Sequence, residues 1–421
     1  MIMTLNPYTL SNPNDITVKN KFLTFIAVML IVITSGSVLF GKLLYSEFIM
    51  ILFAIALVFY FPKRIEPKQF LILLFIVIFL LFNMLLYQNN LNGYIGLILK
   101  MAAVFMVLNR IDLRQAAQSY QWLIVALALL GMPFYLAGVL DAALVRQLVP
   151  PTPVWGGAYR ITPFHVYGLW NMTRNQGIFW EPGAYQVFLN LGIFLMLFTN
   201  RKVPKWKLLI LTATLLTTMS TSGYMICALI YLAYVIRNGK REQLAQMVMS
   251  LIVFIPLAFF IVQSGVITDK FQEDNASFNR RSLDTTSNLQ LLVEKPLVGW
   301  GFQNNEVLME RYGLPDSSNS LLTFGYQFGL PLLLILMIYY FFQLLRPIGG
   351  VFQTLLIFIG LVIVFSTENM LFQPIFLVLM FLDTSRLRLN EKIESGEIRG
   401  NEVSRIRRPL RQQPVTAKEG I

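Results

Sequence analysis

Charged residues, cysteine and histidine are all scarce in this chain of 421 residues. Asp, Glu, Lys and Arg together make up 13%, about half of the roughly 25% that is usual in soluble globular proteins. Apolar residues make up 56%, which is more than a soluble fold could bury. The composition therefore predicts a polytopic membrane protein. It excludes enzymes that act on nucleic acids, soluble metabolic enzymes and small scaffolds stabilised by disulfide bonds.

The single cysteine and the single histidine exclude two further kinds of site. Cys227 has no partner for a disulfide within the chain, and His165 alone cannot build a histidine-rich metal centre. We therefore expect neither a metal nor a cofactor. The net charge of +12 does not indicate nucleic acid, because membrane proteins collect Lys and Arg on their cytoplasmic side.

Apolar runs along the chain predict about twelve membrane-spanning helices, several of them short. The expected spans are 22–40, 44–61, 70–87, 94–108, 120–140, 184–199, 208–220, 222–236, 248–264, 320–345, 350–366 and 370–384. Basic residues flank both ends of 208–236, so this run should cross an even number of times. The cluster Ser220-Thr221-Ser222-Gly223 predicts the break between its two helices. The expected fold class is all-α, a polytopic integral membrane helical bundle.

An even number of spans would place both termini in the cytoplasm. The two longest connections, 141–183 and 265–319, would then face outside, and most Lys and Arg fall in the segments assigned inside. We expect residues 1–384 to form one transmembrane domain. Residues 385–421 are expected to form a basic cytoplasmic tail that is disordered or lies on anionic lipid.

The first long connection ends in a polar run that leads directly into an apolar segment. Glu181-Pro182-Gly183 predicts a helix start, because proline is tolerated in the first helical turn. Arg174 precedes it and is either an anion-binding residue or the ion-pair partner of Glu181. Aromatic rings are frequent here, and rings beside Arg, Asn and Glu suit a sugar. An aromatic belt at the membrane interface is the alternative.

The second long connection contains an arginine pair, Arg280-Arg281, before an expected helix over 282–294. Two arginines at a helix N-terminus would form an anion site, because backbone N–H groups and guanidiniums point the same way. A solvated basic pair is the alternative. The helix should end at Lys295-Pro296, and the glycines beside Trp300 predict a tight turn.

Lys100 lies deep in an expected span, unlike the other Lys and Arg residues. A charge within the membrane suggests a function. At 1.5 Å per helical residue, Lys100 lies roughly 9 Å from the outer end of its span. It could therefore contact an anion or extend to the outer headgroups, and both interpretations stay open.

Several motifs together resemble the Wzy-type O-antigen polymerases, within the superfamily of O-antigen polymerases and ligases. The motifs are Arg174-x-x-Gly177 with Glu181-Pro182-Gly183, Thr217-x-x-Ser220-Thr221-Ser222-Gly223-Tyr224, Arg281 with Pro296-Leu297-Val298-Gly299-Trp300-Gly301, and Ser317-Ser318-Asn319-Ser320-Leu321-Leu322. The resemblance covers residues 174–331. It implies a helical bundle of the glycosyltransferase C type with two large periplasmic loops.

The resemblance also implies a reaction at the periplasmic face of the bacterial inner membrane. A polyprenyl-pyrophosphate-linked glycan would be transferred onto the non-reducing end of a new lipid-linked repeat unit. The leaving pyrophosphate needs charge stabilisation, which the resemblance assigns to Arg174 and to Arg280 or Arg281. Because no DxD motif lies in the outside loops, we expect a metal-independent enzyme. Glu181 is the expected general base and His165 the second candidate.

The remaining expectations concern binding. Substrate contacts are expected from Arg160, His165, Lys100, Tyr224, Asn319, Trp180 and Trp300. The expected partners are the donor and acceptor, which are both polyprenyl-pyrophosphate-linked oligosaccharides, and the lipid bilayer. A chain-length regulator stays open as a further partner, and no nucleic acid is expected.

Two other functions compete with the polymerase. An O-antigen ligase of the same superfamily would differ only in its acceptor, but many ligases have a histidine where this chain has Ser318. A lipid-linked oligosaccharide flippase or other transporter would need polar residues lining its spans, usually in two related halves. Here the polarity lies in the two long connections, which weighs against transport.

Overall fold

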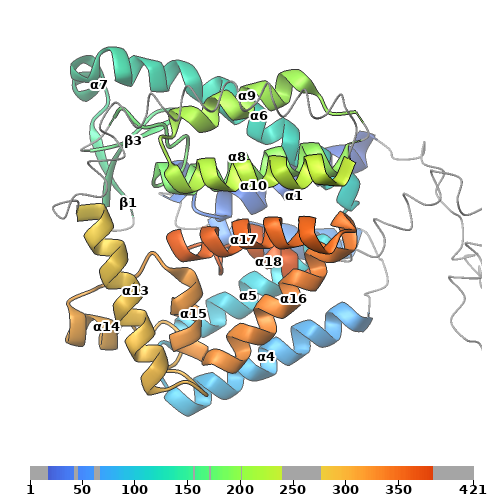
Figure 1. The fold of residues 1–421 in the computed structure, drawn as a ribbon, viewed down its shortest axis with the longest axis vertical. Helices are drawn as coiled ribbons and strands as arrows, with labels where there is room; N and C mark the ends of the chain where they lie inside the picture. The colour runs from blue at the N-terminus through green and yellow to red at the C-terminus, as the bar shows by residue number, and fades with distance from the viewer. Residues whose placement is uncertain are drawn as a thin grey trace, which may run out of the picture. The chain divides into compact units, whose positions relative to one another are not determined.

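The computed structural model describes residues 18–41, 46–60, 67–154, 157–169, 172–200, 202–238 and 276–382. All of them belong to the first of two units into which the chain divides, Met1–Leu382. The second unit, Asp383–Ile421, which contains the expected basic tail, and the expected span 248–264 lie outside the described residues. The described chain is mostly helical (Figure 1).

Five helices in the described chain are long and apolar enough to cross a membrane. They are α4 (Pro67–Tyr87), α5 (Leu91–Leu108), α6 (Leu113–Leu140), α8 (Pro182–Thr199) and α16 (Leu330–Ile348). Shorter apolar stretches lie in α1 (Val18–Thr34), α3 (Ser46–Tyr60), α10 (Thr221–Asn238) and α17 (Val351–Thr367). The other helices are α2 (Val38–Gly41), α7 (Ala142–Leu148), α9 (Lys205–Thr217), α13 (Ala276–Glu294), α14 (Asn305–Tyr312), α15 (Ser320–Phe328) and α18 (Pro374–Phe381).

Helix α4 shows why the fold needs an apolar solvent. Most of its length is exposed, yet its exposed side chains are large and hydrophobic. They include Phe70, Leu71, Leu74, Phe75, Ile78, Leu81, Phe82 and Leu85. A continuous exposed apolar surface of this kind is typical of a helix that faces lipid, where every backbone polar group is bonded within the helix.

The predicted break within 208–236 is confirmed. Helix α9 ends at Thr217 and α10 begins at Thr221, and Met219 between them has a positive φ of 50°. The hydroxyl of Ser220 accepts a hydrogen bond from the Gly223 amide at 3.3 Å, which caps the new helix. In Figure 1 both helices extend from this turn toward the right of the view, so the chain reverses its direction here.

Two predicted spans are wrong in their extent, because each is divided at a glycine. The expected span 320–345 consists of two helices, α15 and α16, which meet at Gly329 with φ of 90°. The expected span 22–40 ends at Thr34, and Gly36 turns the chain with φ of 105°. Glycine adopts these values without the steric cost that other residues incur.

The expectation of an all-α fold is also wrong for the first long connection. Residues of this connection form an antiparallel sheet of β1 (Pro151–Val154), β2 (Gly157–Ile161) and β3 (Val166–Gly168), in the order β1-β2-β3. The prolines of β1 are tolerated because the strand lies at the sheet edge. Val154 and Val166 pack with Val38 in a small buried cluster, which fastens the sheet to the bundle.

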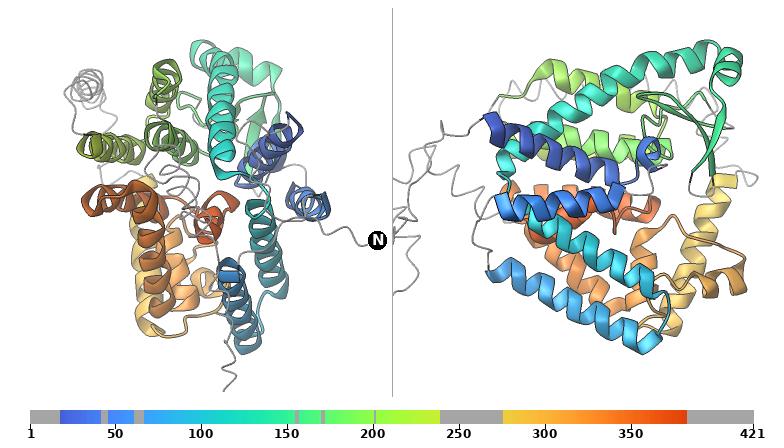
Figure 2. Two further views of the ribbon diagram at one scale, coloured as in Figure 1. Left: turned by 90° about the vertical axis from the view of Figure 1, so that its right-hand side faces the viewer. Right: turned by 180° about the vertical axis from the view of Figure 1, so that it is seen from behind.

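The described helices pack so that the long connections gather at one end of the bundle. Helix α10 packs along α8 and α17, while α5 packs along α3, α4 and α18. The sheet, α7, α13 and α14 lie together at the left of Figure 1 and at the right of the rear view in Figure 2. Residues far apart in sequence are thereby brought together at this end.

Candidate functional site

Arg174 is held by the break between α9 and α10. Its Nε donates to the carbonyl oxygen of Thr218 at 3.1 Å, and a terminal nitrogen donates to that of Met219 at 3.2 Å. The neighbouring Asn175 pairs with the backbone carbonyl and the hydroxyl of Thr217, each at 2.9 Å. The last carbonyls of a helix have no partner within the helix, so the break supplies the acceptors that fix the arginine.

Glu181 and Glu368 form a pair of carboxyl groups at the start of α8. Glu181 is the residue before this helix, and its Oε1 accepts a hydrogen bond from Trp180 Nε1 at 2.8 Å. Glu368 follows α17 and is fully buried. A Cβ atom added at Gly183 would lie 2.0 Å from Oε1 of Glu368. Pro182 therefore starts the helix, and Gly183 leaves the space that the second carboxyl occupies.

Burial of Glu368 favours the protonated form of its carboxyl group. Burial raises the pKa of Glu368 well above its usual value, and both the charge of Glu181 and the hydrogen bond to it raise this pKa further. Arg281 and Arg174 act in the opposite direction. Ionised Glu368 would have no hydrogen-bond donor for either oxygen among the described residues. Protonated Glu368 can donate a hydrogen bond to Glu181, which favours the protonated form of Glu368.

Arg281 completes the cluster from α13. Its terminal nitrogen lies 3.8 Å from Oε1 of Glu368, and its side chain is 41% exposed. Arg174 interacts electrostatically with the same three residues. Burial lowers the pKa of Arg174, the charges of Glu181 and Glu368 raise it, and the like charge of Arg281 lowers it. Two guanidiniums therefore flank one carboxyl pair. Sequence reasoning placed three of these four residues in the site and missed Glu368.

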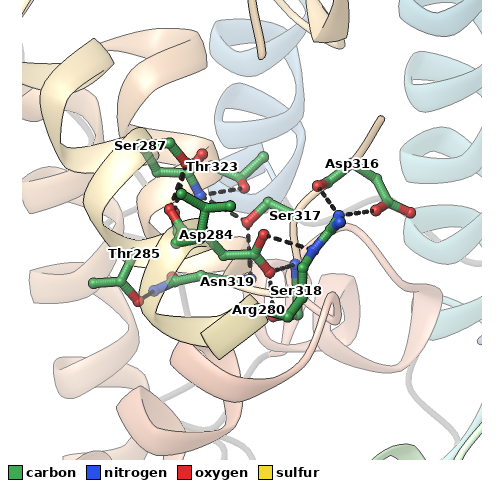
Figure 3. Close-up of polar contacts among 11 residues, drawn as sticks. Arg280, Asp284, Thr285, Ser287, Asp316, Ser317, Ser318, Asn319 and Thr323 are labelled. Carbon is green, nitrogen blue, oxygen red and sulfur yellow. Dashed lines mark hydrogen bonds and ion pairs between the residues drawn. The ribbon is translucent and has the colours of Figure 1, made fainter. Parts of the chain in front are cut away.

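Arg280 has different partners from its neighbour Arg281. Its Nε donates to Asp284 at 3.1 Å, and a terminal nitrogen donates to the carbonyl and carboxylate of Asp316 at 2.8 and 2.9 Å (Figure 3). Buried Asp284 also accepts hydrogen bonds from the backbone amide and hydroxyl of Ser318, at 2.9 and 2.7 Å. Arg280 thus braces α13 against the segment before α15. Ser318, at the position where many ligases have a histidine, belongs to this brace.

The expected helix start at Ser282 is wrong, so the two arginines do not lie at a helix N-terminus. Helix α13 begins at Ala276, so Arg280 and Arg281 lie in its second turn. Backbone amides at these positions lie beyond the four free amides of a helix N-terminus. Successive helical residues point about 100° apart, which is why the adjacent arginines face different partners.

Arg160 and His165 are placed within the small sheet and its surroundings. Arg160 donates to the carbonyl oxygens of Arg146 and Val149 at the end of α7. His165 is fully buried, and its ring packs edge-on against Tyr167 with centroids 4.6 Å apart. Burial lowers the pKa of His165 to about 3, so the imidazole is neutral at physiological pH. Both residues support the connection that carries Arg174.

Two of the predicted binding residues lie beside the cluster. Trp180 orients Glu181 through its indole N–H. The hydroxyl of Tyr224 donates to the carbonyl of Leu216 at 2.7 Å, and its ring lies within electrostatic range of Arg174. These residues position the charged groups.

The other predicted binding residues lie outside the cluster. Trp300 donates to the carbonyl of Leu291 at 2.9 Å, and Lys295 lies 3.7 Å from its ring centroid, so this tryptophan anchors the end of α13. Asn319 caps α15 by accepting a hydrogen bond from the Leu322 amide at 3.0 Å. Lys100 lines a cavity beside α15.

The cluster of Arg174, Arg281, Glu181 and Glu368 combines two guanidiniums with two carboxyl groups, of which buried Glu368 favours its protonated form. Such an arrangement suits a reaction in which a hydroxyl loses a proton while a leaving group gains negative charge. Within the described part of the chain, no group of three or more His, Cys, Asp or Glu side chains could hold a metal ion. In comparisons with known proteins, no protein-family profile and no curated sequence matches the chain.

Proposed function

We propose that this protein is a membrane glycosyltransferase that polymerises lipid-linked glycans, as an O-antigen or exopolysaccharide polymerase does. One observation carries the proposal: Arg174 and Arg281, from two separate connections, converge on the carboxyl pair of Glu181 and Glu368. The motifs that resemble Wzy-type polymerases supply three of these four residues, which supports the same conclusion.

In the proposed reaction the two arginines bind the polyprenyl pyrophosphate of the donor. A hydroxyl oxygen of the acceptor attacks the anomeric carbon as the bond to the pyrophosphate oxygen breaks. Negative charge grows on that oxygen, and guanidiniums stabilise it through paired N–H donors. Among the described residues, two of the five N–H donors of Arg174 are bound to carbonyls, so its other N–H groups can bind the anion.

Glu181 takes the proton of the acceptor hydroxyl in this proposal. It is partly exposed, whereas Glu368 lies buried behind it. A carboxylate held beside the acceptor hydroxyl can take its proton as a general base. Trp180 and the space at Gly183 keep the two carboxyl groups in contact.

The proposed topology follows from the charge pattern. About twelve spans in a glycosyltransferase C-type bundle, both termini in the cytoplasm and two periplasmic connections would set the cluster at the periplasmic face of a bacterial inner membrane. The gathering of both connections at one end of the bundle supports this arrangement. Basic residues on both sides of 208–236 support the orientation.

Reconstitution tests the proposal. Purified protein supplied only with lipid-pyrophosphate repeat units, in EDTA, should form products of increasing length, which appear as a ladder on a gel. If a product formed only after lipid A core was added, the protein would be a ligase. If neither acceptor gave a product, the glycosyltransferase proposal would fail.

A further inference from the structure

A polar cavity lies beside the charged cluster. Its volume is about 390 Å³, and it is formed by the start of α5, by α15 with the segment before it, and by the connection that follows Glu368. Asn369 of its lining is next to Glu368 of the cluster in the chain. Asp316 of its lining belongs to the brace with Arg280. Figure 3 shows Asp316, Ser317 and Thr323 of its wall.

The lining is rich in carboxamide side chains, which can both donate and accept hydrogen bonds. They are Asn92, Gln303, Asn305, Gln327, Asn369 and Gln373. Asn92, Gln303 and Asp316 are exposed, while Tyr326 and Gln327 are buried. The cavity therefore has an open rim and a buried floor, as a binding pocket requires, and its volume falls in the range of about 300–1,000 Å³ typical of such pockets.

Gln327 is the strongest sign that the cavity receives a ligand. Its side chain is 2% exposed, and its Oε1 has no hydrogen-bond partner among the described residues. Its Nε2 lies 3.4 Å from the hydroxyl of Tyr326. A buried acceptor without a donor costs free energy, so it is retained where a donor from outside completes it. A sugar hydroxyl is such a donor.

The remaining lining fits the same chemistry. Phe302, Tyr326 and Phe372 add aromatic rings, against which the C–H face of a sugar ring can pack. Lys100 and Asp316 bring one charge of each sign, so the cavity as a whole favours an uncharged ligand. A lipid chain would leave the six carboxamides without partners.

We infer that this cavity binds an uncharged hexose or N-acetylhexosamine of the lipid-linked glycan. The identity of the glycan as substrate rests on the proposed function, but binding of the sugar is measurable without it. The cavity would hold the glycan while the neighbouring arginines hold the pyrophosphate. Lys100, predicted to contact an anion or headgroups, would instead contact sugar hydroxyls.

Two substitutions test the cavity without disturbing the cluster. Gly96 lines the cavity, and a Cβ atom added there would meet nothing within 4 Å. Gly96→Leu should therefore fill the space, and leucine favours the helix more than glycine does. Gln327→Met keeps the length of the side chain but removes the acceptor. Gln69→Met is the matched control, because Gln69 is a buried glutamine in the first turn of α4.

Saturation-transfer NMR on the full-length protein in lipid nanodiscs provides the readout. The probes are methyl glycosides of glucose, N-acetylglucosamine and glucuronic acid. We expect signals from the two uncharged probes, lost in Gly96→Leu, weakened roughly three- to tenfold in Gln327→Met and unchanged in Gln69→Met. Absence of signal, equal signals in Gly96→Leu and wild type, or a preference for the glucuronide would each overturn the inference.

The same measurement separates the two proposals. Arg174→Ala should still bind the methyl glycosides, because Arg174 does not line the cavity. If the wild-type protein bound the glycosides but formed no polymer ladder, the sugar site would stand and the polymerase proposal would be refuted. Ladder formation without glycoside binding would do the reverse.

Discussion

Asp284 and Glu368 are both buried acids at the same end of the bundle, and their surroundings differ in one respect. Asp284 accepts hydrogen bonds from Arg280 and from the amide and hydroxyl of Ser318. Glu368 receives none on either oxygen within the described chain, and burial raises its pKa. A buried acid with donors holds two segments together, whereas one without donors keeps its proton close to a reactive neighbour.

The adjacent arginines repeat this difference. Arg280 is bound to two acids and a carbonyl, whereas Arg281 lies 3.8 Å from Glu368 and is more free to bind an anion. Under the proposed function, the brace around Asp284 would stabilise the fold and the cluster around Glu368 would carry out the reaction. The four predictions below test that division, from the largest expected effect to the smallest.

Glu181→Gln should reduce polymerisation by about 10²–10⁴-fold, because an amide cannot accept the proton of the acceptor hydroxyl. The rate of ladder growth in the reconstituted assay measures it. Glu294→Gln is the matched control: its carboxylate pairs with Arg311 on the surface, where such pairs contribute little. Equal rates for Glu181→Gln and the control would remove Glu181 from the reaction.

Arg281→Ala should reduce the rate by about 10²–10³-fold with protein amounts unchanged. Arg281→Lys should recover only part of it, because an ammonium lacks the planar fork of donors. Arg280→Ala should instead lower the free energy of unfolding by about 1–2 kcal/mol, since Asp284 loses a donor. Activity assays and thermal unfolding together distinguish the two. The division would be wrong if Arg280→Ala abolished activity at an unchanged melting temperature.

Gly183→Ala should reduce the rate by about 10²-fold, the cost typical of a displacement of about 1 Å in an active site. The new methyl group would overlap Oε1 of Glu368 and force the carboxyl pair apart. Gly96→Ala is the control, since no atom opposes its methyl group. A Gly183→Ala protein with the wild-type rate would show that contact between the two carboxyls is dispensable.

The pH dependence of stability should differ between wild type and Glu368→Gln. Glu368 has a raised pKa in the fold, so its contribution is fully present below its ordinary value of 4.5 and is lost as pH rises through the folded value. Melting temperatures of the wild type should therefore fall more steeply with rising pH than those of Glu368→Gln. Parallel curves would mean that Glu368 ionises normally.

Much of the helical fold could be predicted from apolar runs, and the break before Thr221 from its turn-forming residues. The glycines that divide two spans were missed, although Thr34-Ser35-Gly36-Ser37 and Gly329-Leu330-Pro331 are turn-forming patterns. The apolar segments on either side of each glycine led us to predict one span in each place. The sheet was missed because its strands have three to five residues. Strands this short give too few alternations to predict a period.

Within the site, motif order predicted Arg174, Glu181 and Arg281, but it did not separate Arg281 from Arg280. The different roles of the two arginines depend on where α13 begins, and the sequence before Arg280 contains only a weak signal for the start of a helix. Glu368 is a single acid at the end of an apolar helix. Its importance arises from contact with Gly183, which is 185 residues away in the chain, and no local pattern encodes such a contact.

In the proposed reaction, a proton on Glu368 beside ionised Glu181 would also set the electrostatic balance of the cluster. Before reaction, two guanidiniums and one ionised carboxyl leave an excess of positive charge that attracts a pyrophosphate. When the acceptor proton reaches Glu181, the carboxyl pair becomes neutral and that excess grows. Negative charge appears on the departing pyrophosphate in the same step. A cluster built in this way would strengthen its hold on the leaving lipid carrier as the new glycosidic bond forms, and return of the proton to water would loosen it for release.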